Sequence, residues 1–118
     1  MVGNESGRPD LNGQKMSWIY LVAAGLLEVV WAYFMKQSEG FTRLVPSSIT
    51  IVAMIASFAL LALAMRTLPL STAYTVWTGI GAIGAFLVGT FIIGEPVNAM
   101  RITAALLITA GLVLMKLS

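Results

Sequence analysis

The chain has 118 residues, of which 58% are hydrophobic and 10% are charged, and its formal net charge is +2 at pH 7. Because a soluble domain typically carries about 25% charged residues, this composition predicts an integral membrane protein. The small net charge gives no indication of nucleic acid binding, and the absence of cysteine and histidine excludes disulfides, thiolate chemistry and histidine catalysis.

The chain divides into a polar start and a long apolar remainder. Residues 1–15 are polar and predict a disordered N-terminal tail or an alternative start, ahead of one transmembrane domain at 16–118. Each of four apolar segments is long enough to cross a hydrocarbon core of about 30 Å as a helix. The sequence therefore predicts an all-α integral membrane protein whose four transmembrane helices lie at about 17–35, 44–65, 69–94 and 97–116.

The first apolar segment contains a single charge, Glu28, near its middle. A charge at the bilayer midplane costs about 2.5–3.5 kcal/mol on insertion scales, so it usually faces a bundle interior, a water-filled cavity or a cation. Glu28 is therefore a candidate functional residue. On a helix, residues three and four positions away share its face, and most of them here are small enough for another helix to approach. These neighbours are Ala24, Gly25, Trp31 and Ala32.

Polar residues also lie deep in the second and third segments. Ser57 in the second segment has two interpretations: a hydroxyl that bonds the carbonyl four residues earlier, or one that holds a buried carboxylate in position. In the third segment, Tyr74, Trp77, Thr78 and Gly81 share one stripe. The O–H of Tyr74 and the N–H of Trp77 need partners at this depth.

Small residues recur in the last two segments. Gly79, Gly81 and Gly84 allow close packing against another helix, and they also weaken the helix enough to make them hinge candidates. Small residues in the fourth segment repeat at intervals of seven, which indicates helix–helix association and hence a homodimer.

The charged residues outside the spans do not define an orientation. Three basic residues lie on the side of the termini and three on the opposite side: Lys15, Arg66 and Lys116, against Lys36, Arg43 and Arg101. The positive-inside rule then favours neither orientation, so either another feature such as Arg8 sets it or the chain inserts in both. The loop acids Glu39 and Glu95 are expected to be solvated, and Glu95 to favour the start of the last helix.

The chemistry that these residues offer is that of a cation site. A carboxylate neutralises a cation and aromatic faces attract it. The sequence holds no cluster of metal ligands and no nucleophile–base pair, so we expect neither a metal site nor an enzyme.

Over residues 16–118 the chain resembles the small multidrug resistance family of transporters, on three stretches of sequence: AGLLEVVWAYFMKQSEGFTRLVPSSIT, RTLPLSTAYTVWTGIGAIGA and GEPVNAMR. The pairing of Glu28 with Trp31 resembles the guanidinium exporter branch, because the quaternary-ammonium branch generally has a smaller residue where Trp31 stands. The resemblance implies an antiparallel, dual-topology homodimer in the bacterial inner membrane.

The resemblance also implies roles for individual residues. Glu28 would bind protons and substrate, and Met54 and Phe58 would line the pocket or its portal. The substrate site would be lined by Gly25, Trp31, Ser57, Tyr74 and Trp77. The implied function is export of guanidinium and small guanidinyl cations in exchange for protons by alternating access, driven by the proton gradient without a cofactor. The alternatives are a broad exporter of quaternary ammonium and other multidrug cations, a small dual-topology ion channel, and a non-transporting membrane subunit.

Overall fold

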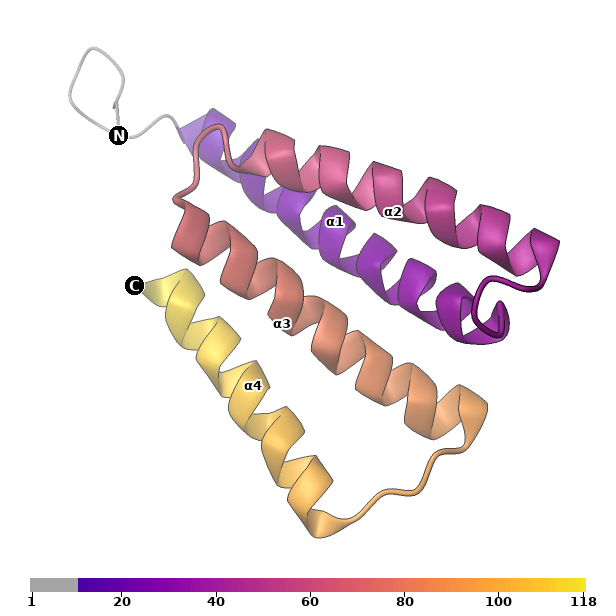
Figure 1. The fold of residues 1–118 in the computed structure, drawn as a ribbon. Helices are drawn as coiled ribbons and strands as arrows, with labels where there is room; N and C mark the ends of the chain where they lie inside the picture. Colours follow the sequence, from indigo (N-terminus) through magenta and orange to yellow (C-terminus); the bar gives the residue numbers. More distant parts are fainter. Residues whose placement is uncertain (1–10) are drawn as a thin grey trace.

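The computed structural model describes residues 11–118, and the regular structure in this part of the chain is entirely helical (Figure 1). Four of its helical segments are long and apolar enough to cross a membrane, which confirms the predicted all-helical fold with four spans. The elements are α1 (Leu11–Gln37), α2 (Leu44–Ala64), α3 (Leu70–Val88), the short π-helix η1 (Gly89–Ile93) and α4 (Ala99–Leu117).

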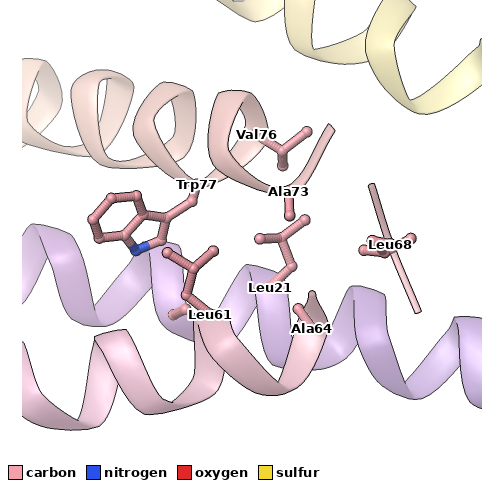
Figure 2. Close-up of a cluster of buried hydrophobic side chains, with 8 residues drawn as sticks. Leu21, Leu61, Ala64, Leu68, Ala73, Val76 and Trp77 are labelled. Carbon is pink, nitrogen blue, oxygen red and sulfur yellow. The ribbon is translucent and has the colours of Figure 1, made fainter. Parts of the chain in front are cut away.

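Helices α1, α2 and α3 form the packed part of the fold. Both α2 and α3 lie against α1, and Figure 1 shows α3 between α1 and α4. A core of buried apolar side chains joins the three helices near the turn between α2 and α3 (Figure 2). Alanine at several core positions lets the helix backbones approach closely. The core consists of Leu21, Ala24, Leu61, Ala64, Leu68, Ala73, Val76 and Trp77.

Helix α4 is attached differently from the others. Among the described helices its backbone lies close to that of α3 only, at the open edge of the fold (Figure 1), and none of its residues is buried. Near its end, the Lys116 ammonium lies 4.4 Å from the centroid of the Trp18 ring on α1, a cation–π contact. The apolar surface of α4 is therefore free to meet lipid or another chain.

The first helix begins earlier than the sequence indicated. It starts at Leu11, so residues 11–15 belong to α1 and not to the predicted polar tail. The reason is that adding residues to an existing helix is favourable once the first turn has formed, and the polar residues Gln14 and Lys15 propagate a helix well. Residues 1–10 of the predicted tail lie outside the described part.

The third span is helical from Leu70 to Ile93, close to the predicted 69–94, but its last turn is a wide one, the π-helix η1. The backbone N–H groups of Gly94 and Glu95 both donate to the carbonyl oxygen of Gly89, and Gly94 has a left-handed φ of 85° that glycine adopts without strain. The chain then turns into α4, which starts at Ala99, two residues after the predicted start. The Asn98 side chain caps this helix by accepting from the Arg101 N–H at 2.9 Å.

The two loop acids differ in their surroundings. Glu39 is exposed, as expected, and lies 3.8 Å from Arg43. Glu95 is only half-exposed, because its side chain turns back toward Gly89 at the end of α3. Its carboxylate therefore does not serve the start of α4, where Asn98 provides the cap.

Candidate functional site

The Glu28 side chain lies in the interface between α1 and α3. A Cβ atom added to Gly81 of α3 would overlap the Glu28 carboxyl group, so the carboxyl group occupies the space that the glycine leaves. Its Oε1 atom is buried and finds no hydrogen-bond partner among the described residues. A buried polar atom without a partner costs about 1–3 kcal/mol, so this oxygen has an unmet need for a hydrogen-bond donor.

Other glycines bring α1 and α3 together on either side of Glu28. A Cβ atom at Gly25 would lie 2.6 Å from Cγ2 of Ile80, and one at Gly84 would overlap the Val29 side chain. Gly79 lies instead against Leu112 of α4. The packing interpretation therefore accounts for all three glycines that we named as hinge candidates in α3, and their hinge role stays a prediction.

Ser57 connects three helices through one hydroxyl group. This buried hydroxyl donates to the Ala24 carbonyl oxygen at 2.6 Å and accepts from the Trp77 indole N–H at 3.0 Å. The interpretation in which Ser57 bonds within its own helix is therefore wrong. The hydroxyl also does not bond the Glu28 carboxyl group directly. Instead it holds the α1 backbone one turn before Glu28, and it is the acceptor that the buried Trp77 N–H needs.

Four aromatic rings form a row that starts one helical turn beyond Glu28. The rings of Trp31 and Phe58 have centroids 6.4 Å apart, and both the Phe58–Trp77 and Trp77–Tyr74 separations are 5.6 Å. Trp77 is 6% exposed, whereas Phe58 and Tyr74 are 47% and 52% exposed. The row therefore has one buried ring, Trp77, between two exposed rings, Phe58 and Tyr74. The indole N–H of Trp31 is buried and unpaired in the described part.

The structure thus brings Glu28, Trp31, Ser57 and Trp77 into one region. Met54 is half-buried on α2 and shares a face with Phe58, one turn further along. The residues described contain no group of three or more histidine, cysteine, aspartate or glutamate side chains that is placed to hold a metal ion. Sequence reasoning missed the contact between Gly81 and Glu28 and the acceptor role of the Ala24 carbonyl, since neither leaves a periodic signal.

Replacing Ser57 with alanine should destabilise the fold. The substitution removes the acceptor of a buried Trp77 N–H, and we expect the free energy of unfolding to fall by about 1–2 kcal/mol. Ser48→Ala is the matched control, because the exposed Ser48 hydroxyl bonds only the Leu44 carbonyl in its own helix, at 2.9 Å. Unfolding by SDS in mixed micelles, followed by circular dichroism, measures both; equal losses would contradict a special role for Ser57.

The fold and the site define a class of protein: a multi-pass helical membrane protein with one unpaired acid, beside aromatic rings, in its interior. The model of the family described as Small Multidrug Resistance protein matches residues 16–108. The chain is 58% identical over 103 residues to proteins described as "Guanidinium exporter" from Escherichia coli (strain K12), Citrobacter freundii and Salmonella typhimurium. Each alignment covers 87% of this chain and 98% of the relative.

The chain belongs to the small multidrug resistance family. The resemblance seen in the sequence is confirmed, including its likeness to the guanidinium exporter branch. The protein is therefore a transporter and not an enzyme, and it is a multi-pass protein of the bacterial inner membrane.

Proposed function

We propose that this protein exports guanidinium and small substituted guanidinyl cations in exchange for protons. The observation that carries the proposal is the Oε1 atom of Glu28, which is buried and has no hydrogen-bond donor among the described residues. A guanidinyl cation supplies the N–H donors and the positive charge that such a carboxylate lacks. Relatives described as guanidinium exporters support this choice of substrate.

Exchange follows from competition for one carboxyl group. Glu28 can hold a proton or neutralise a cation, but it does not do both at once, so binding of one releases the other. Two Glu28 side chains in a dimer would bind a planar cation in its own plane, in the fork geometry that strengthens such pairs. Trp31 and Trp77 would cover its flat faces, and Ser57 would keep the preceding turn of α1 in place.

The functional unit that we propose is an antiparallel, dual-topology homodimer. The even division of basic residues supports insertion in both orientations, and the uncovered surface of α4 supports assembly with a second copy. Alternating access would then arise by rocking of the two subunits, with α3 bending near Gly79–Gly84. If two protons enter for each monovalent cation exported, the membrane potential contributes about 2.3 kcal/mol per 100 mV.

A substrate panel tests the proposed function. Purified protein in proteoliposomes should give a current and a proton flux on addition of guanidinium or a mono-alkyl guanidinium, and little of either with tetramethylammonium, which has no N–H donors. Empty liposomes provide the background. An equal or larger response to tetramethylammonium would indicate a broad quaternary-ammonium exporter, and guanidinium flux without proton flux would indicate a channel.

A further inference from the structure

The interface between α1 and α3 opens into a cavity beyond Glu28. Its volume is about 180 Å³, enough for several water molecules at about 30 Å³ each, or for a small cation. Apolar side chains line most of it, together with three polar ones: Tyr33 and Lys36 at the end of α1, and Glu95 after η1. Nothing in the proposed function so far uses this cavity.

The Glu95 carboxylate is held at the wall of the cavity by the wide turn. A Cβ atom on Gly89 would overlap Oε1 of Glu95. The carboxylate therefore contacts the Gly89 main chain directly, in the space that a side chain would otherwise fill. The Glu95 N–H donates to the Gly89 carbonyl at 2.8 Å. Because the main chain and the side chain of Glu95 both return to the same turn, the carboxylate has a defined place and is half-exposed toward the cavity.

The cavity and the Glu28 site both lie between α1 and α3, at different positions along the helix axes. Glu28 contacts α3 at Gly81, and Glu95 contacts its continuation at Gly89. Eight residues of helix separate these glycines by about 12 Å along the axis. Val29 packs on Gly84 between the two levels and also lines the cavity. A cation at Glu95 would therefore be about two helical turns from Glu28.

We propose that Glu95 and Tyr33 form an outer site that receives the transported guanidinyl cation on its way to or from Glu28, and that Lys36 competes with the cation there. This inference rests on the proposed function. The carboxylate and the phenol oxygen accept hydrogen bonds from the edge of a planar cation. Mg²⁺ or Ca²⁺ would not be satisfied by these two oxygen-bearing side chains, because each of these ions takes six or more oxygen ligands. Lys36 is exposed and lines the same cavity, and the rotatable bonds of a lysine side chain let its ammonium group approach or leave the carboxylate.

Two substitutions that should shift KM in opposite directions test the outer site in a transport assay. Glu95→Gln should raise the KM for guanidinium about two- to fivefold, which is what a partly exposed charge pair supplies, with kcat nearly unchanged. Lys36→Gln should lower KM, because it removes the competitor. Glu39→Gln is the matched control: it removes an acid at the same end of the subunit that is exposed and pairs with Arg43. A KM for Glu95→Gln equal to that of this control, or KM shifts of the same sign for Glu95→Gln and Lys36→Gln, would overturn the proposal.

A binding measurement separates the outer site from the proposed function. The Glu28→Gln protein, labelled with ¹³C at glutamate carboxyl groups, would be titrated with millimolar guanidinium chloride and, separately, tetramethylammonium chloride. Glu95→Gln in the same background assigns the signal. The Glu95 signal should shift with guanidinium only. No shift, or an equal shift with both salts, would overturn the outer site even where the wild-type protein transports guanidinium. A guanidinium-specific shift without wild-type transport would instead refute only the proposed function.

Discussion

Replacing Glu28 with glutamine is expected to reduce guanidinium-driven proton flux to the level of empty liposomes. Glutamine keeps the shape of the side chain that fills the space beside Gly81, so the fold should persist. It carries no negative charge and exchanges no proton, so both halves of the proposed exchange are lost together. A pH-sensitive dye inside proteoliposomes measures the flux, and circular dichroism confirms that the variant is folded.

Two further variants show whether the loss of proton flux is caused specifically by removing the buried carboxyl group. Glu39→Gln removes an exposed acid and should transport like the wild type. Glu28→Asp keeps the carboxyl group on a shorter side chain, so it should retain coupled transport with a changed pH optimum. Proton-coupled uptake by the Glu28→Gln protein would refute the proposed mechanism.

The second large effect is expected from Gly81→Ala. The new methyl group would take the place of the Glu28 carboxyl group, and we expect the displaced side chain to lose most of its guanidinium binding. Overpacking of this kind typically costs about 1–3 kcal/mol of stability, while the better helix propensity of alanine returns up to about 1 kcal/mol. Guanidinium affinity, measured by quenching of tryptophan fluorescence, should therefore change more than the unfolding midpoint.

Gly79→Ala is the matched control for this substitution. It adds the same methyl group two residues earlier on α3, where the group meets the flexible Leu112 side chain and not Glu28. If the glycines act as a hinge, both variants should lose transport; if Gly81 provides space for the carboxyl group, only Gly81→Ala should. In the second case, combining Gly81→Ala with Glu28→Asp should recover part of the binding, because the shorter side chain needs less room.

The spans were predictable from the sequence, and so were their ends to within two residues, except for the start of α1. An uncharged run of about 20 residues has few alternatives to a membrane helix, so the four spans follow from composition. The start of α1 at Leu11 depends on helix propagation into polar sequence, and the wide turn at Gly89–Ile93 depends on how the chain returns toward α4. Neither is encoded in hydrophobicity.

The candidate site was predictable in its parts and not in its connections. Glu28 stands out as the one acid within a span, and helical periodicity correctly places Trp31 on its side of α1. Periodicity does not say which helix a face meets, so the bond from Ser57 to the Ala24 carbonyl and the fit of Glu28 against Gly81 required the three-dimensional arrangement.

The Ser57 hydroxyl has a mechanical consequence. Because it bonds the Ala24 carbonyl and the Trp77 indole at once, it links α1, α2 and the first half of α3 at one point. If the protein works by the proposed alternating access, motion within the chain would then fall beyond Trp77, where the first residue that weakens the helix is Gly79. Bending at this point would move the second half of α3 relative to α1, while the end of α4 stays with the first half through the contact of Lys116 with Trp18. The serine would thus set where the subunit is stiff and where it yields.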